Sequence, residues 1–440
     1  MPTYRIITLG CKVNQQESEV ISKLLKNASW HLSPKNDKAD LYIINTCTVT
    51  GKASMQSRQE IRKAIKANPK AKVIVTGCYA QTAPDEIIKI EGVHEIAGNA
   101  FKVAIPESVL SSEISIENDS PVLKISDMMK ETRFKKFPVT VPDERTRPFI
   151  KIQDGCNAFC TYCIVPHARG KSRSMPAEDV IERLRLFKKK GFHEAVLTGI
   201  HMGCYGQDLD PENGLLYDLL HRIDIEKIMD RIRLSSIEPH ELTYDIINLA
   251  AASDTICSHF HIPLQSGDDN ILKKMHRPYT AELVRNLVLK IKDVLPKAAI
   301  GVDVMAGFPG ETEQAFENTC ELIEELPVSY LHVFPFSPRK GTPAATYSGQ
   351  VNHDTTRERC RKIREIGKAK REAFYKKAKG KKVNVLIETK RDSATGLLKG
   401  FSSNYIPVLV SGEDHFMNQI VSVKIDYIQD DLKVFGLVSD

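Results

Sequence analysis

Short apolar runs that alternate with helical patterns constrain the first hundred residues most strongly. Residues 4–9, 41–44 and 72–76 have the length and apolar content of strands, and the segments between them have helical spacing. Strands that alternate with helices imply right-handed crossovers and a parallel sheet. The N-terminal part is therefore predicted to be a Rossmann- or flavodoxin-like α/β domain.

A cysteine follows each of these three expected strands. Cys11, Cys47 and Cys78 come after residues 4–9, 41–44 and 72–76. A lone cysteine of this kind is usually a core residue. In a parallel sheet, however, ligands bind at the carboxyl ends of the strands, so the topology brings these three thiols to one edge. The coincidence indicates a three-thiolate site.

A second triplet, Cys156, Cys160 and Cys163, has CxxxCxxC spacing. Iron–sulfur clusters and structural zinc sites usually take four ligands, so a triplet without a neighbouring fourth cysteine leaves one corner of the metal site open. Zinc-finger cysteines come instead as CxxC pairs. Such tight spacing favours a metal site over clustered core or disulfide cysteines.

Six more strand patterns alternate with helical patterns and predict a partial (β/α)6 barrel. They begin near residues 149, 194, 232, 259, 300 and 331. The loops at the carboxyl ends should carry the chemistry. Glycine or polar residues follow four of the strands, namely Gly199, Ser236, Gln265 and Gly307. His261 and His332, inside apolar runs, are interpreted as hydrogen-bonded core residues.

The last sixty residues carry short period-two patterns with glycine turns, as in 381–388 and 420–427. They predict a small antiparallel β-barrel. Upstream, residues 357–382 are dense in lysine and arginine. Such a run is often only a solvated helix face, but beside a small barrel it also fits a surface that follows phosphates.

The length of 440 residues allows two or three domains, and the net charge of +6 permits a polyanionic partner without requiring one. We expect domains at 1–110, 146–376 and 377–440 and a linker at 111–145, where polar residues and prolines accumulate. No leader pattern and no long apolar run is apparent. A cytoplasmic protein without membrane association is therefore expected.

The motifs together resemble the radical S-adenosylmethionine methylthiotransferases over essentially the whole chain. The CxxxCxxC loop, residues 155–173, resembles the radical S-adenosylmethionine signature of that family. Residues 9–14, 45–50 and 76–81 are similar to its auxiliary-cluster domain, and the C-terminal barrel resembles its RNA-binding TRAM module.

The resemblance implies two [4Fe-4S] clusters and S-adenosylmethionine. Cys156, Cys160 and Cys163 would hold the cluster whose open iron binds S-adenosylmethionine, and reductive cleavage there would yield a 5′-deoxyadenosyl radical. The first three cysteines, Cys11, Cys47 and Cys78, would hold a second cluster that carries the sulfur to be methylated. S-adenosylmethionine contacts are expected from Tyr162, Gly199, Ser236, Gln265 and Gly307. The implied partners are tRNA, an electron donor such as flavodoxin or ferredoxin, and a sulfur source.

The motif sequences are most similar to those of the bacterial branch that acts on N6-threonylcarbamoyladenosine in tRNA. The product would be 2-methylthio-N6-threonylcarbamoyladenosine at adenosine 37, beside the anticodon. Isopentenyladenosine in tRNA or a ribosomal-protein aspartate are alternative substrates, and a non-catalytic, metal-containing RNA-binding protein is an alternative of another class. At positions 204 and 268 the family usually has small residues or serine, whereas this chain has Cys204 and Asp268.

Overall fold

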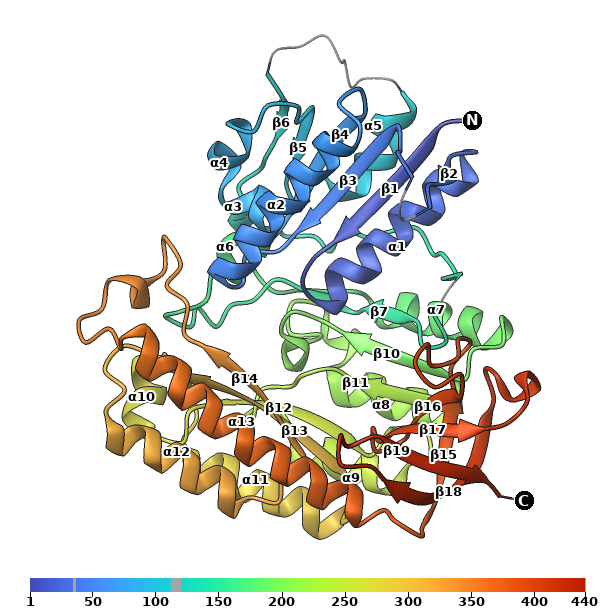
Figure 1. Cartoon of the computed structure of the whole chain (residues 1–440), viewed down its shortest axis with the longest axis vertical. Helices are drawn as coiled ribbons and strands as arrows, with labels where there is room; N and C mark the ends of the chain where they lie inside the picture. Colours follow the sequence, from blue (N-terminus) through green and yellow to red (C-terminus); the bar gives the residue numbers. More distant parts are fainter. Residues whose placement is uncertain (35–36, 112–119, 144, 440) are drawn as a thin grey trace. The chain divides into compact units, whose positions relative to one another are not determined.

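A parallel sheet of six strands carries the N-terminal part of the chain (Figure 1). Its order is β2-β1-β3-β4-β5-β6, and every neighbouring pair is parallel. The strands are β1 (Thr3–Thr8), β2 (His31–Leu32), β3 (Leu41–Thr46), β4 (Lys72–Gly77), β5 (Glu95–Ala97) and β6 (Val122–Lys124). The order of the first five strands is that of flavodoxin-like sheets, which confirms the predicted fold class.

The computed structural model describes residues 1–34, 37–111, 120–143 and 145–439. The chain divides into unit 1 (Met1–Pro142, Gln153–Met175 and Ser337–Ala345) and unit 2 (Asp143–Ile152, Pro176–Phe336 and Thr346–Asp440). The CxxxCxxC segment thus belongs to the same unit as the N-terminal sheet. The domain limits expected from the sequence stay predictions. Within the expected linker, residues 122–124 form β6, while 112–119 and 144 lie outside the described residues.

Helices pack on both faces of the unit 1 sheet because each strand presents apolar residues to both sides. Tyr42 and Ile44 of β3 pack with Ile61 of α2 in one core. The neighbouring β3 residues 41 and 43 pack with Ile21 of α1 and Ile105 of α5 in the other. The elements are α1 (Lys12–Asn27), α2 (Gly51–Ala67), α3 (Cys78–Thr82), α4 (Pro84–Ile88), α5 (Ile105–Leu110), α6 (Val165–Arg169) and the small hairpin β8 (Gln153–Asp154) and β9 (Arg173–Ser174).

Unit 2 contains all six strands predicted for the partial barrel. They form two parallel three-stranded sheets, β11-β10-β7 and β12-β13-β14, and an isolated parallel bridge pairs Ile232 of β11 with Ile256. The strands are β7 (Phe149–Lys151), β10 (Glu194–Thr198), β11 (Arg231–Leu234), β12 (His259–Gln265), β13 (Ala299–Ala306) and β14 (Tyr330–Pro335). Their helices are α7 (Ala177–Lys189), α8 (Leu216–Ile225), α9 (Tyr244–Ala252), α10 (Asp269–Lys274), α11 (Ala281–Val294), α12 (Glu313–Glu325) and α13 (His353–Lys376).

The C-terminal strands close into a barrel in the order β15-β16-β17-β19-β18. They are β15 (Lys382–Ile387), β16 (Leu398–Ser402), β17 (Pro407–Ser411), β18 (Ile420–Ile428) and β19 (Val434–Val438). The predicted small antiparallel barrel is confirmed, with one parallel pair, β17 and β19, among four antiparallel ones. A closed ring with an odd number of strands cannot alternate direction throughout, so one parallel pair is unavoidable.

Short 3₁₀ helices occur in the connections, namely η1 (Lys102–Ala104), η2 (Met128–Lys130), η3 (Met202–Cys204), η4 (Pro211–Asn213), η5 (Pro343–Thr346) and η6 (Asp414–Phe416). None of the helices in the described ranges combines the length and the apolar character that a bilayer span requires.

The side chain of Arg233 on β11 connects the C-terminal barrel to strands β10 and β11. Its guanidinium donates to both carboxylate oxygens of Glu194 at 2.7 and 3.2 Å and to the carbonyls of Ser402 and Ser403 at 3.0 and 2.9 Å. Both charged side chains are buried. Burial alone would raise the pKa of Glu194, but Arg233, with help from two more arginines, holds that pKa below its usual value.

We expect Arg233→Leu to lower the free energy of unfolding by about 2–4 kcal/mol, because it leaves Glu194 buried without its main partner. Urea unfolding followed by circular dichroism measures this loss. Arg285→Leu is the matched control: Arg285 forms a similar fork to Glu325 with both side chains partly exposed. It should cost about 0–1 kcal/mol. Equal losses in the two variants would contradict the assignment of Arg233 as a buried clamp.

Candidate functional site

Three neighbouring strands bring Cys11, Cys47 and Cys78 to the carboxyl edge of the unit 1 sheet. The cysteines follow β1, β3 and β4, which are adjacent in the sheet. Burial, and then the neighbouring Cys78 and Cys11 thiols, raise the pKa of Cys47 to about 11. Such a thiol remains protonated at neutral pH until a metal displaces its proton.

A close approach between β3 and β4 positions two of these cysteines. Thr46 and Gly77 are paired across the strands, and Cys47 and Cys78 are the next residues. Gly77 has φ 96° and ψ −168°, a conformation open essentially only to glycine. A Cβ at Gly77 would lie 2.4 Å from the carbonyl oxygen of Thr46. Glycine is therefore what allows the two thiol-bearing turns to lie side by side.

The CxxxCxxC loop closes on itself through its own backbone. The amide of Cys156 donates to the carbonyl of Gly170 at 2.9 Å, and the amide of Cys163 donates to the carbonyl of Cys160 at 2.9 Å. The Ala158 amide donates to the Cys156 sulfur at 3.4 Å. Cys160 is buried, whereas Cys156 and Cys163 are partly exposed. The loop thus holds three thiols in a fixed turn, two of them with access to solvent.

A buried charge network joins this loop to the N-terminal sheet within unit 1. Arg169, at the end of α6, donates to both carboxylate oxygens of Glu17 at 3.1 and 3.2 Å. It also donates to Asp154 at 2.9 Å and to the side-chain oxygen of Asn14 at 2.7 Å. Lys102 donates to Glu17 at 2.6 Å. Since Asn14 and Glu17 lie on α1, just after Cys11, the network connects the segments that bear both cysteine sets.

Cationic side chains also lie close to the first cysteine set. Arg169 opposes the rise in the pKa of Cys47 that burial causes. Arg339 donates to the hydroxyls of Thr48 and Ser54 at 2.6 and 2.8 Å, beside Cys47. Positive charges here favour thiolates and the negative charge of a thiolate-bound metal cluster.

Sequence reasoning missed Arg169, Glu17 and Arg339. One signal was available for Glu17, which lies on the apolar face of α1, one helical turn from Val13 and one from Ile21. A charged residue on such a face is buried only with a partner. The identity of that partner depends on a contact between residues 152 positions apart, which no local pattern shows.

The other predicted cofactor-binding residues lie at strand ends of unit 2, except for Tyr162, which lies on the CxxxCxxC loop of unit 1. Gly199, Ser236, Gln265 and Gly307 occur at or just beyond the carboxyl ends of β10, β11, β12 and β13. Gln265 has φ +67° at an irregularity in the β12–β13 pairing. Strained conformations of this kind concentrate at ligand sites.

Gly307 has a structural reason of its own. Its amide donates to Glu311 at 2.7 Å, and a Cβ there would lie 2.3 Å from the hydroxyl of Thr356 on α13. Helix α13 can therefore approach the end of β13 only because residue 307 has no side chain.

Two family models match the chain. One model, described as Uncharacterized protein family UPF0004, matches residues 3–98. The other, of the Radical SAM superfamily, matches residues 150–323. The chain is 40% identical to the Threonylcarbamoyladenosine tRNA methylthiotransferase MtaB of Bacillus subtilis, over 97% of this chain and 94% of that relative. It is 35% identical to the tRNA-2-methylthio-N(6)-dimethylallyladenosine synthase of Clostridium tetani, over 96% of this chain and 93% of the relative.

The chain belongs to the radical SAM tRNA methylthiotransferases. Among solved structures, it is similar to the radical S-adenosylmethionine methyltransferase TsrM from Kitasatospora setae, with a TM-score of 0.57 and 14% identity over 78% of this chain and 77% of that chain. This likeness shows the fold alone, and it agrees with the α/β architecture described above.

In this methylthiotransferase, Asp268 and Cys204, the two residues that differ from those usual in the family, have different structural roles. Asp268 caps α10, because its carboxylate accepts from the amides of Asn270 and Ile271 at 3.0 Å each and from the Asn318 side chain at 2.8 Å. Cys204 lies instead in a buried polar cluster with His201 and Glu241. Cys257 and Cys320 are buried.

Replacing Gly77 should disturb the methylthiotransferase at its first cysteine set. Gly77→Ala forces a glycine-only conformation on alanine and places the Cβ against Thr46, so we expect a stability loss of about 3 kcal/mol or more. Gly191→Ala is the control: its φ is +84°, but no atom lies within 4 Å of the added Cβ. That variant should lose only about 1 kcal/mol. Urea midpoints of both variants test this, and similar losses would contradict a steric role for Gly77.

Proposed function

We propose that this enzyme adds a methylthio group to C2 of N6-threonylcarbamoyladenosine at adenosine 37 of tRNA. Three relatives named for threonylcarbamoyladenosine are 37–40% identical to the chain, and one named for dimethylallyladenosine is 35% identical. Modification of isopentenyladenosine is the alternative within tRNA.

The distribution of cysteines is the observation that carries the proposal. Of the ten cysteines, all within the described ranges, six lie in unit 1 as two sets of three, and the other four lie in unit 2. A four-iron cluster held by three thiolates has one iron without a protein thiolate. Two such sets fit an enzyme that needs two reactive clusters, whereas a structural zinc site is closed by four ligands.

The residues divide the work between the two sets. Cys156, Cys160 and Cys163 hold the cluster that binds S-adenosylmethionine, and Cys11, Cys47 and Cys78 hold the auxiliary cluster. When bound, the first cluster together with S-adenosylmethionine would supply the radical chemistry. The auxiliary cluster would supply the sulfur that is methylated and transferred. The buried Arg169 and Lys102 and the half-buried Arg339 fit this assignment, because cations offset the negative charge of thiolate-bound iron.

Tyr162 of the CxxxCxxC loop in unit 1 is one proposed S-adenosylmethionine contact, and the strand-end residues Gly199, Ser236, Gln265 and Gly307 of unit 2 are proposed contacts on separate grounds. Backbone groups at the carboxyl ends of parallel strands are available to a ligand. The bend at Gln265 frees backbone groups there from regular pairing. An electron donor such as flavodoxin or ferredoxin and a separate sulfur source complete the reaction.

A lysine-rich cavity of about 610 Å³ in unit 2 supplies an RNA-binding surface. It lies between α11, α13 and the C-terminal barrel and is lined by Lys292, Lys297, Lys370, Lys377, Lys381 and Lys382. Burial, together with Lys377, lowers the pKa of Lys292 to about 8. Crowded ammonium groups of this kind gain from an anion such as an RNA phosphate.

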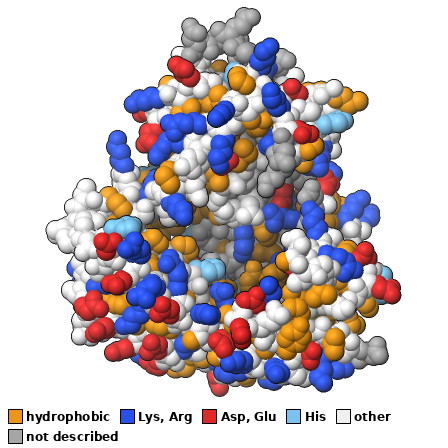
Figure 2. Space-filling view, in the orientation of Figure 1, with side chains coloured by type: hydrophobic (Ala, Val, Ile, Leu, Met, Phe, Trp, Pro, Cys, Tyr) orange, Lys and Arg blue, Asp and Glu red, His pale blue; other side chains and the backbone are white. Residues whose placement is uncertain are grey.

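The rest of α13 is less selective for anions. Over α12 and α13, Figure 2 shows basic side chains interspersed with acidic ones. Glu358, Glu365 and Glu372 of α13 break up its positive charge. The basic run of residues 357–382 therefore concentrates its charge at the C-terminal end, beside the barrel.

Replacing Lys297, Lys381 and Lys382 together with alanine should weaken tRNA binding. The slope of log affinity against log salt should fall by about 1 for each lysine that contacts a phosphate. Filter binding at several salt concentrations measures both effects. Alanine at the three exposed lysines of residues 188–190, which line no part of the cavity, is the control. Equal effects of the two triple variants would contradict a specific surface.

The reaction itself is tested by mass spectrometry of nucleosides from tRNA of cells that lack or re-express the protein. Alanine at all three cysteines of either set should abolish 2-methylthio-N6-threonylcarbamoyladenosine, since each cluster has a separate task. Only loss of Cys156, Cys160 and Cys163 should also abolish 5′-deoxyadenosine release in vitro. If both triple variants lose it equally, the division of labour is wrong.

Metal content separates this enzyme from a non-catalytic RNA-binding protein. Anaerobic reconstitution with iron and sulfide should give about eight irons per chain, as two four-iron clusters require. Zinc in place of iron, with no cleavage of S-adenosylmethionine, would support the non-catalytic alternative. If the tRNA nucleoside profile is unchanged and a ribosomal protein is modified instead, the substrate is the ribosomal-protein aspartate.

A further inference from the structure

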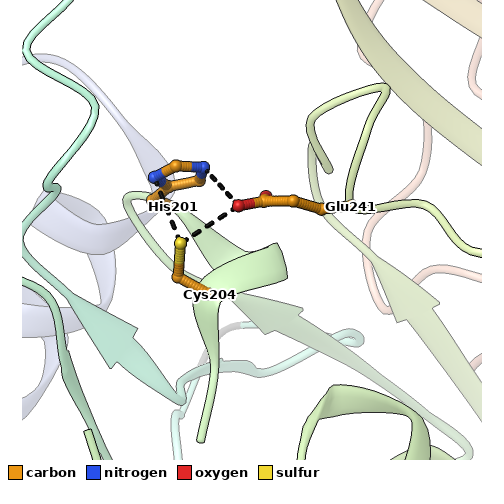
Figure 3. Close-up of side chains that lie close together, drawn as sticks. All are labelled: His201, Cys204 and Glu241. Atoms are coloured by element: carbon orange, nitrogen blue, oxygen red, sulfur yellow. Dashed lines mark hydrogen bonds and ion pairs between the residues drawn. The ribbon is translucent and has the colours of Figure 1, made fainter. Parts of the chain in front are cut away.

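A third cluster of metal-ligand side chains lies in unit 2, separate in sequence from both cysteine sets. His201, Cys204 and Glu241 each offer one donor atom, and these atoms lie within 4.8 Å of one another (Figure 3). His201 follows β10, Cys204 ends η3, and Glu241 lies in the loop between β11 and α9. The cluster therefore joins the loops at the carboxyl ends of two paired strands, β10 and β11.

The donor atoms of the cluster lie close together, and one of the two ring nitrogens of His201 would serve as its ligand atom, since a single ion binds only one nitrogen of an imidazole. The Cys204 sulfur lies 3.6 Å from Nδ1 of His201 and 3.0 Å from Oε1 of Glu241, and Nε2 of His201 lies 2.9 Å from the same oxygen. Tetrahedral zinc with these ligand types separates its donor atoms by about 3.3–3.7 Å. A shift of about 0.5 Å in the Glu241 carboxylate would bring the sulfur–oxygen pair into that range.

Two features indicate that the cluster is built for a cation. The side chain of Glu241 is only 10% exposed. Its second oxygen, Oε2, is buried and accepts no hydrogen bond from any described residue. A buried carboxylate oxygen without a donor is costly unless a cation compensates it. Gly203 makes the arrangement possible, because a Cβ there would lie 2.1 Å from that oxygen.

We propose that His201, Cys204 and Glu241 bind one Zn²⁺ ion that fixes the β10 and β11 loops to each other. Thiolate and imidazole ligands favour zinc over magnesium or calcium. Binding releases the thiol proton of Cys204 to solvent, so the ion is held by thiolate, carboxylate and neutral imidazole. The site then has no net charge, which suits a buried position. Three protein ligands leave one coordination position for water.

Zinc content and zinc X-ray absorption of the holoenzyme test this assignment. The protein is reconstituted anaerobically so that iron fills the cysteine sets, incubated with zinc sulfate, and desalted. We expect about one zinc per chain, with one sulfur near 2.3 Å and the other ligands, nitrogen or oxygen, near 2.0–2.2 Å. Absence of zinc overturns the proposal. A shell of three or four sulfurs also overturns it, because zinc would then lie at the cluster cysteines.

Variants locate the ion. Cys204→Ser and Glu241→Gln should each lower zinc content at least fivefold and leave iron content unchanged. Cys320→Ser replaces another buried cysteine of unit 2 and should keep zinc. His332→Asn disrupts the other group with metal-ligand chemistry, His261, Asp303 and His332, and should keep zinc too. Loss of zinc in His332→Asn with retention in Cys204→Ser would overturn the assignment. The wild-type absorption spectrum decides the question if a variant fails to fold.

Discussion

A buried ion pair between Arg169 and Glu17 holds the cysteine-bearing segments of unit 1 together. Taking both charges out of water is costly, so the pair persists only because the two terminal nitrogens of Arg169 find several acceptors. Arg169 donates to four acceptor oxygens, and Lys102 gives Glu17 a second cation. Two cations thus face the carboxylates of Glu17 and Asp154. The CxxxCxxC segment cannot leave the N-terminal sheet without stranding a buried carboxylate, which couples the positions of the two thiol sets.

The local features of this chain could be predicted from its sequence, and the long-range pairings could not. Strand and helix periodicity, with cysteines after strands, was enough to place Cys11, Cys47 and Cys78 at one sheet edge, because parallel topology follows from the alternation. The partners of buried charges do not follow from periodicity. Arg169 with Glu17 and Arg233 with Ser402 connect residues more than 150 positions apart. The parallel β17–β19 pair also required the closure of the barrel, which no single strand encodes.

The protonation state of the thiols explains why cations surround them. Burial and mutual repulsion keep Cys47 protonated in the absence of metal, so the free protein stores no buried negative charge there. Metal binding must then release protons and create thiolates. Arg169 and Arg339 make that conversion less costly without forcing it in advance. Cys11, as the N-cap of α1, gains further from the partial positive charge of a helix N-terminus.

Position along a parallel strand separates the proposed ligand cysteines from the core cysteine Cys257. Cys257 precedes the amino end of β12, where it is buried near the Arg233–Glu194 ion pair, and burial raises its pKa to about 11. Cys47, Cys78 and Cys204 come after the carboxyl ends of strands, where the chain turns toward a helix and leaves polar backbone groups available. Burial alone does not distinguish them, since Cys47 and Cys257 are both buried. Position at a strand-to-helix turn, rather than burial, is therefore what the proposed ligand cysteines share.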